Sequence, residues 1–273
     1  MTRCKLLIAV ILSFVLTLSS AHADVIILTS RSQYALEVAN KIQLGIKAPS
    51  EIKHSIDHVK DTDIVVALGN EALAEAERKA SKKIVASFIG YSGRNNKNIK
   101  TIIYAEPSPE TLAHFFDVNF NKARIGILYS PKDREYIERI NSSLKTGNNE
   151  LIPIVSTGDT FVEINKLIRM DIDLLFIRND DAIYKPGNIR FVLETLFRKR
   201  IPVITNTKSL LKAGATAAIT PDEELIIRET IEAINLLSSG KVNSIPYRFI
   251  ETAKTDTNKS MIKILNVKIK EDN

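Results

Sequence analysis

Polar side chains follow several apolar runs of the sequence at the point where each run ends. Arg178 directly follows the run at residues 173–177, and Asp180 comes two residues later. Comparable positions near the ends of apolar runs are held by Asn70, Ser87, Asn179, Thr205 and Asn206. If these runs are parallel strands, their carboxyl ends meet at the edge of a sheet, where ligands of open α/β folds collect. The sequence therefore predicts a ligand-binding site built from these residues.

The residue types suggest which groups such a site could bind. A carboxylate such as that of Asp180 can partner a ligand ammonium, because a buried charge without a partner is costly. Hydroxyls and backbone N–H groups at a helix N-terminus suit a ligand carboxylate. The guanidinium of Arg178 binds carboxylates in bidentate fashion, so its presence in the site would favour an anion over a zwitterion. The alternative for each residue is structural, since Asp, Asn, Ser and Thr also serve as helix caps and turn residues, and Arg178 as a surface charge.

The sequence contains no motif that indicates catalysis. It contains no G-x-S-x-G, P-loop or G-x-G-x-x-G motif, and its single cysteine is Cys4. His54 and His58 are four residues apart and could share a helix face as metal ligands. However, residues 51–56 alternate like a strand, and no third ligand is obvious. We therefore expect no metal, no cofactor and no enzymatic activity.

The N-terminal 23 residues are typical of a secretory signal peptide. Arg3 and Lys5 precede an apolar run at residues 6–18, and Ala21-His22-Ala23 provides an A-x-A cleavage site. Cleavage there would leave a periplasmic chain that begins at Asp24 and lacks cysteine. The alternative is an uncleaved membrane anchor, although no long apolar stretch follows. Arg3 and Lys5 supply two of the six net positive charges, so the mature chain would have a net charge of +4. Its charged residues are spread along the sequence and form no basic block, which argues against nucleic acid as a partner.

Short apolar runs alternate with amphipathic stretches along the rest of the chain. Predicted strands lie at residues 25–28, 64–68, 84–89, 101–104, 125–129, 151–155, 173–177 and 202–205. Predicted helices lie near residues 34–46, 72–80, 112–116, 136–144, 162–168, 191–197 and 225–237. Alternation of this kind predicts an α/β fold with parallel sheets.

Two prolines at 107 and 109 indicate a passage from one α/β unit to the next, with Ser108 as the cap of the following helix. We expect a first lobe of residues 24–106 with about 222–245, and a second lobe of 107–221 with about 246–273. Residues 247–250 and 261–267 are strand-like, which predicts an edge strand and a cross-connection. Two doubly wound parallel-sheet lobes joined by a hinge form a clamshell, whose ligand lies in the cleft between the lobes.

Residues from Pro107 to about Pro246 resemble a known family, the substrate-binding proteins of ABC transporters with a type I periplasmic-binding fold. The segments that carry the resemblance, in one collinear order, are 107–112, 123–131 (ARIGILYSP, against AKRIGVLYNP), 201–206, 211–215 and 239–246. The chain also departs from the family. Where the family has P-T-D-N, this chain has Arg178-Asn179-Asp180-Asp181 and keeps only the aspartate, and Asn206-Thr207 replaces an S-D pair. The first lobe is also shorter, with little room for a helix between 51–56 and 63–68.

The resemblance implies an exported protein that binds a small ligand, an amino acid or a small carboxylate, and delivers it to the membrane permease of an ABC importer. Asp180 is the residue that this resemblance singles out for ligand contact. The altered positions leave an alternative open, a signalling module that docks on a membrane sensor or transporter without taking up solute. We expect a monomer in either case.

Overall fold

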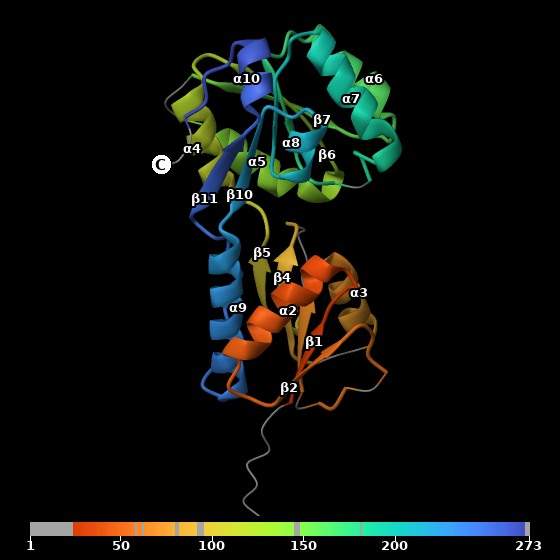
Figure 1. The fold of residues 1–273 in the computed structure, drawn as a ribbon, viewed down its shortest axis with the longest axis vertical. Helices are drawn as coiled ribbons and strands as arrows, with labels where there is room; N and C mark the ends of the chain where they lie inside the picture. The colour runs from red at the N-terminus through yellow and green to blue at the C-terminus, as the bar shows by residue number, and fades with distance from the viewer. Residues whose placement is uncertain are drawn as a thin grey trace, which may run out of the picture.

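The computed structural model describes residues 24–57, 59–61, 63–79, 82–91, 96–144, 148–180 and 182–270. The predicted signal peptide, His58 and Asp181 lie outside the described residues. Among the residues that are described, no helix is long and apolar enough to cross a bilayer. The chain forms two α/β lobes stacked end to end (Figure 1).

The first lobe contains a fully parallel five-stranded sheet in the order β2-β1-β3-β4-β5. Its strands are β1 (Val25–Leu28), β2 (Ser50–Lys53), β3 (Ile64–Leu68), β4 (Ile84–Ile89) and β5 (Ile99–Tyr104). Helices α2 (Gln33–Gly45) and α9 (Glu223–Ser238) pack on one face, and α3 (Asn70–Arg78) packs on the other. Because helices cover both faces, β1, β3 and most of β4 are buried along their length, which explains their continuous apolar runs. Between β2 and β3 the described residues form no helix, as the short interval in the sequence predicted.

The second lobe contains a six-stranded sheet in the order β11-β10-β9-β8-β6-β7, parallel except for the antiparallel edge strand β11. Its strands are β6 (Arg124–Tyr129), β7 (Glu150–Val155), β8 (Leu174–Ile177), β9 (Val203–Thr205), β10 (Ala217–Pro221) and β11 (Ala253–Thr257). Helices α4 (Pro109–Asn119) and α5 (Arg134–Ser143) share a core on one face. Helices α6 (Thr160–Arg169) and α7 (Pro186–Arg198) share a separate core on the other. A short 3₁₀ helix (Pro131–Asp133), α8 (Ser209–Ala213) and α10 (Lys259–Leu265) complete this lobe.

Side chains cap the two helices that begin at the crossings between the lobes, and one of these caps, Ser108, was predicted from the sequence. The hydroxyl of Ser108 accepts a hydrogen bond from the backbone N–H of Thr111 at 3.0 Å, and Pro109 occupies the first turn of α4. The carboxylate of Asp222 caps α9 in the same way through Glu224 N at 3.0 Å. Both caps lie where the chain passes between the lobes, so they set the direction in which α4 and α9 leave the hinge.

The C-terminal segment differs from the prediction. Residues 261–267, expected as a strand, lie mostly in helix α10, which is capped by Asn258 through Met261 N at 3.1 Å. The edge strand is β11 instead, a polar segment that pairs with β10. Residues 247–250 contribute one parallel bridge, between Arg248 and Ile103 of β5. Alternating polarity misled the prediction because the side chains of α10 are half-buried or exposed on all sides.

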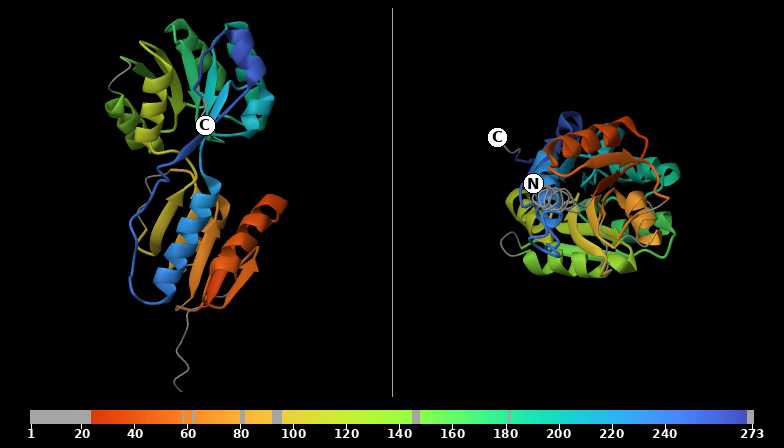
Figure 2. Two further views of the ribbon diagram at one scale, coloured as in Figure 1. Left: turned by 60° about the vertical axis from the view of Figure 1, so that its left-hand side comes forward. Right: turned by 90° about the horizontal axis from the view of Figure 1, so that it is seen from below.

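The chain crosses between the lobes near residues 105–108, 221–222 and 246–252 (Figure 2). The last crossing runs beside β5, where Arg248 N donates to Ile102 O at 2.8 Å and Tyr104 N donates to Arg248 O at 3.0 Å. On these crossings we propose the division into a first lobe of residues 24–106 with about 222–245 and a second lobe of 107–221 with about 246–273.

Replacing Gly45 by Ala should loosen the contact between α2 and α9. A Cβ at Gly45 would lie 2.5 Å from Cδ1 of Ile231, so one of the two helices must shift. We expect Gly45→Ala to lower the free energy of unfolding by about 1–3 kcal/mol. In Gly45→Ala combined with Ile231→Ala, the loss should be smaller than the sum of the two single losses.

Denaturant unfolding of the four proteins measures this coupling. Gly187→Ala is the matched control, because a Cβ at Gly187 meets nothing within 4 Å. Strictly additive losses at positions 45 and 231 would show that the helices do not meet as described.

Candidate functional site

A pocket of about 840 Å³ lies between the two lobes, beside the hinge. The first lobe contributes Tyr34 at the start of α2 and Phe88 of β4, and the second lobe contributes the loops after β8 and β9. We call it the interlobe pocket; its lining residues are Tyr34, Phe88, Ala105, Asn179, 206–209, 220–224, Ile226 and Lys254. A hollow walled by both lobes changes shape whenever the lobes move, which is the geometry that a hinged binding protein needs.

Two of the predicted site residues, Asn179 and Asn206, line the interlobe pocket together. The backbone N–H of Asn179 donates to the side-chain oxygen of Asn206 at 2.8 Å, so the ends of β8 and β9 are tied to each other. Asn179 is exposed and Asn206 is buried. Asn179 thus offers an exposed side chain to the pocket, whereas the side-chain amide of Asn206 is held by Asn179 N and by Glu106.

Asn70 lies at the start of α3, exposed, in a separate hollow of about 350 Å³ that Ser30, His54 and Gly69 also line. A Cβ built on Gly90 would be 3.7 Å from the side-chain nitrogen of Asn70 and 3.9 Å from Oε1 of Glu106. Asn70 therefore stands at the first-lobe border of the contact between the lobes, close to Glu106.

Ser87 and Thr205 are fully buried inside their lobes. The hydroxyl of Ser87 lies 2.6 Å from that of Thr230 on α9, and the hydroxyl of Thr205 accepts from Thr207 N at 3.1 Å. These partners fit the structural alternative for both residues. A direct ligand contact by either one stays a prediction.

Asp180 is 8% exposed and makes local hydrogen bonds. Its carboxylate accepts from Ala182 N at 3.0 Å and from the hydroxyl of Ser130, and its carbonyl accepts from Tyr184 N at 2.8 Å. It therefore shapes the loop between β8 and α7, as the structural alternative requires. A role in ligand contact stays a prediction.

Arg178 is the centre of a buried ion cluster, which we define as Glu106, Asp133 and Arg178. The guanidinium is 5% exposed and binds Glu106 in bidentate fashion, with Nε to Oε2 at 2.7 Å and Nη2 to Oε1 at 2.8 Å. Its Nη1 lies 2.7 Å from Oδ2 of Asp133, and its plane lies over the ring of Tyr136 at 4.8 Å. Two carboxylates of the protein thus balance one guanidinium, so Arg178 has no charge left over for a ligand anion.

Glu106 is the functional residue that sequence reasoning missed. It is 2% exposed and, besides Arg178, accepts hydrogen bonds from Tyr91 N and from the side chain of Asn206 at 3.2 Å. The available signal was an acidic residue directly before the prolines of the crossing. Its partner lies 72 positions away, and a single sequence does not reveal such a pair.

The ion cluster also joins the two lobes. Nη2 of Arg178, from the second lobe, donates to the carbonyl of Tyr91 in the first lobe at 2.8 Å. The ring of Tyr91 packs against Tyr136 with centroids 5.3 Å apart, and Phe249 of the third crossing stacks on Tyr104 at 4.4 Å. Burial and a hydrogen bond to Glu135 raise the pKa of Tyr91 to about 12, so its phenol stays neutral. The aromatic rings exclude water from the cluster, which strengthens each charge interaction.

Asp133 is the member of this cluster whose charged form is least well compensated for burial. Burial raises the pKa of its carboxyl above the ordinary value, and the nearby Arg178 offsets only part of that effect. Apart from this contact with Arg178, the carboxylate oxygens of Asp133 have no hydrogen-bond partner among the described residues. Its charged form is therefore held by one ion pair alone, which is a weak compensation for desolvation.

Charges on the wall of the interlobe pocket are mostly paired within the protein. Lys254 lies 2.9 Å from Asp222, and this contact is the main reason that the pKa of Asp222 is lowered. Lys208 lies 2.8 Å from Asp256. The phenol of Tyr34 donates to Glu223 at 2.7 Å, so the partner of Glu223 is an uncharged group.

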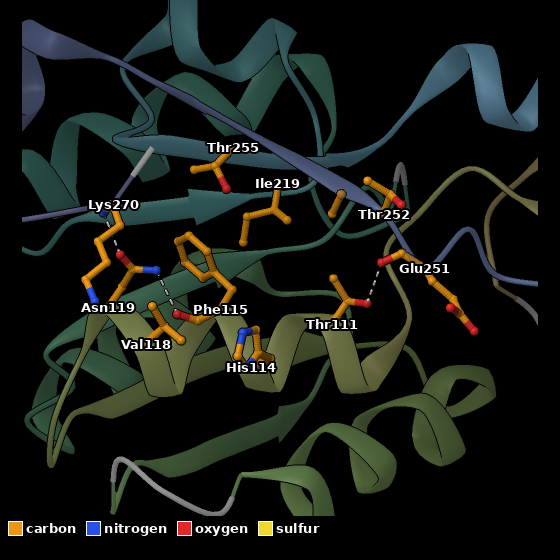
Figure 3. A pocket seen from close by; sticks show the side chains of 11 residues that line it. Thr111, His114, Phe115, Val118, Asn119, Ile219, Glu251, Thr252, Thr255 and Lys270 are labelled. Atoms are coloured by element: carbon orange, nitrogen blue, oxygen red, sulfur yellow. Dashed lines mark hydrogen bonds between the residues drawn. The ribbon is translucent and has the colours of Figure 1, made fainter. Parts of the chain in front are cut away.

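No group of three or more potential metal-binding side chains occurs among the residues that the structure describes. His54, one of the two histidines considered as metal ligands, has its Nδ1 3.1 Å from the carbonyl of Thr29. A further hollow of about 300 Å³ lies between α4 and the C-terminal segment (Figure 3). His114, Phe115 and Lys270 are among its lining residues, and none of the predicted site residues is.

Residues 110–272 match the model of the family described as ABC transporter substrate binding protein. Among curated proteins, none matches the chain. Solved structures with a similar fold include an ABC domain from Streptococcus pneumonia in complex with L-Trp, with a TM-score of 0.65 and 15% identity over 92% of this chain and 97% of that one. A ligand-free, open substrate-binding protein with adhesive properties from Clostridium difficile gives the same four values. A conserved domain protein from Vibrio cholerae has a TM-score of 0.63 and 16% identity over 92% of this chain and 96% of that one.

Neutralising Glu106 should destabilise the protein far more than neutralising Asp133. In Glu106→Gln the buried Arg178 loses its bidentate partner, so we expect a loss of about 3–5 kcal/mol in the free energy of unfolding. Asp133→Asn removes a charge whose burial is itself unfavourable. At neutral pH, this variant should therefore lose less than half as much free energy of unfolding as Glu106→Gln.

The pH dependence follows from the raised pKa of Asp133. Folding favours the protonated form of that carboxyl, so the penalty for burying its charge is absent in acid and appears as pH rises through the folded pKa. The stability of Asp133→Asn relative to the unmodified protein should therefore improve between acid and neutral pH. Urea unfolding of both proteins across that pH range measures the difference in their free energies of unfolding. A variant that becomes relatively less stable as pH rises would contradict the raised pKa.

Proposed function

Because the chain belongs to the family of ABC transporter substrate-binding proteins, we propose that it binds a small solute in the interlobe pocket and delivers it to the permease of an ABC importer. The observation that carries this proposal is the pocket itself, which takes its walls from both lobes. A solute held there would favour one angle between the lobes, and the permease would recognise that closed form. The proposed role is binding without catalysis, by a monomer that needs no cofactor.

An amino acid is the ligand class that we propose, in preference to a small carboxylate. An anion would need an unbalanced cation, whereas Arg178, Lys208 and Lys254 all have carboxylate partners within the protein. A zwitterion brings its own balance of charge. The L-Trp complex of the Streptococcus pneumonia domain is consistent with a ligand of this class.

The proposed contacts divide by position. Asn179 and Asn206 would bind the ligand directly, and Asp180 would partner its ammonium once the lobes close. Asn70 would approach from the first lobe. Arg178 would position Asn206 through their shared partner Glu106, and Ser87 and Thr205 would support the strand ends from beneath.

Export to the periplasm is part of the same proposal. We expect the protein recovered from the extracytoplasmic fraction to begin at Asp24, because Ala21-His22-Ala23 suits signal peptidase. Intact-mass measurement and N-terminal sequencing identify the first residue. Ala23→Phe should block cleavage, since the peptidase requires small residues at this site. A full-length chain that is found in the cytoplasm would contradict the proposal.

A second candidate function is docking on a membrane sensor without solute uptake. It is favoured by the ion cluster, which ties the lobes together through Arg178 and Tyr91 without any ligand. The fold is also similar to that of the XylFII–LytSN complex, which is consistent with this kind of role. The TM-score is 0.57, with 13% identity over 88% of this chain and 99% of that one.

Thermal unfolding in the presence of amino acids and small carboxylates tests the proposed ligand class. A ligand that binds only the folded protein raises the Tm, by an amount equivalent to about 2.7 kcal/mol at a hundredfold excess over Kd. We expect amino acids to raise the Tm and carboxylates without an ammonium group to leave it unchanged. Silence across the whole panel, with a folded sample, would favour the docking function.

Calorimetric titration then tests the proposed contact by Asp180. Asp180→Asn should weaken the binding of the amino acid at least about tenfold, since it removes the charge that faces the ammonium. Asp61→Asn is the matched control, because Asp61 pairs with Lys82 on the exposed surface of the first lobe. Unchanged affinity in Asp180→Asn would leave Asp180 with its loop-capping role alone.

A further inference from the structure

Exposed apolar side chains concentrate on two neighbouring helices of the second lobe. Of ten large apolar side chains that are well exposed among the described residues, five lie on α6, on α7 or just after α6: Phe161, Val162, Met170, Phe191 and Phe197. The rings of Phe161 and Phe191 meet edge to face, with centroids 4.4 Å apart. The aromatic pair thus bridges α6 and α7. These two helices lie side by side on the outer side of the second lobe (Figure 1).

These side chains are not needed by the core. The inward positions of the two helices are already filled by Ile164 and Leu167 of α6 and by Val192, Leu193 and Leu196 of α7. Phe161, Val162 and Phe191 are instead 40–59% exposed. Apolar side chains that gather on the outer side of two helices indicate an interaction surface.

Cations lie among these apolar side chains. Helical spacing puts Lys166 and Arg169 on the same stripe of α6 as Val162, and Arg198 on the same stripe of α7 as Phe191. We call this surface the α6–α7 face; it consists of Phe161, Val162, Lys166, Arg169, Arg190, Phe191, Glu194, Phe197 and Arg198.

The positive charge of the α6–α7 face is not balanced locally. Within the described part of the chain, Lys166 and Arg169 form no ion pair, nor do the flanking Lys185, Lys199 and Arg200. Arg190 and Arg198 share the single carboxylate of Glu194, at 2.9 and 3.8 Å.

Few exposed acids offset this charge. Glu163, the other acid on these helices, is buried and accepts from the hydroxyls of Ser156 and Thr157. Asp159, the N-cap of α6, is exposed at the start of this helix, and Asp171 and Asp173 are exposed after its end. An excess of cations therefore remains on the face.

We propose that the α6–α7 face binds an anionic phospholipid surface. Aromatic and aliphatic side chains interleaved with Lys and Arg suit the boundary between lipid headgroups and acyl chains, and the lipid phosphates supply the missing negative charge. The interlobe pocket and the hollows described above are lined by other elements, so the proposal is independent of any solute. Such contact would keep the protein close to the membrane.

Flotation with vesicles tests this proposal. Every variant is purified from the same extracytoplasmic fraction, so that all samples have the same N-terminus. We expect it to float with vesicles of equal parts phosphatidylcholine and phosphatidylglycerol and to stay behind with phosphatidylcholine alone. High salt should release it, because salt screens exposed charges.

Two pairs of variants separate the face from general properties of the chain. Lys166→Glu with Arg169→Glu should reduce partitioning more than about tenfold, since each cation near an anionic surface strengthens binding about fivefold. Lys259→Glu with Lys263→Glu makes the same change in net charge on α10 and should leave most of the binding intact. Phe161→Ser with Phe191→Ser should also weaken binding, whereas Leu44→Ser with Ile264→Ser, at positions that are more exposed, should not.

Three outcomes would overturn the proposal. Equal loss in the α10 variant would show that only net charge matters, and equal flotation with phosphatidylcholine alone would show that no anion is recognised. Failure to float with either vesicle would assign the face to a protein partner instead. Circular dichroism and Tm of each variant confirm that the samples are folded.

Discussion

The contact between the two lobes depends on one desolvated guanidinium. Arg178 is placed by β8 in a region that water does not reach, and its charge is tolerated there only because Glu106 and Asp133 lie against it. Glu106 comes from the crossing between the lobes, and the Tyr91 carbonyl comes from the first lobe. The orientation of the lobes and the position of Asn206 are therefore tied to the same set of charges.

This arrangement explains why the predicted site is only partly assembled. Arg178 was expected either to face a ligand or to lie on the surface, and it does neither, because two carboxylates from distant parts of the chain surround it. Asn179 and Asn206 reach the interlobe pocket because parallel strands end side by side. Ser87 occupies a similar place in the sequence but is turned inward onto α9. The pairing register of β4 with β5 shifts between Ser87 and Ile89, where Phe88 has a φ of 57°. No local pattern in the sequence predicts such a bulge.

The fold itself was largely predictable. Continuous apolar runs identified most of the buried strands, because helices cover both faces of each sheet, and Ser108 with Pro109 marked the start of α4. The buried strand β10 was not predicted, and the other errors lie in the C-terminal segment, where periodicity is weak. Strand β11 is polar and stands at an edge, so it lacks the apolar run of a central strand. Helix α10 buries no side chain completely, so the usual 3.6-residue pattern is blurred.

The three crossings have a consequence for how the chain acquires its structure. Helix α9 and the segment that pairs with β5 both follow strands β6 to β10 of the second lobe in sequence, yet they complete the core and the edge of the first. A chain that emerges from the ribosome therefore lacks these parts of the first lobe until about residue 250 has been made. Contacts over such separations form slowly, because a long loop must close before any of them is gained. The nascent first lobe should accordingly remain loosely structured for most of synthesis and become stable only when the chain is nearly complete.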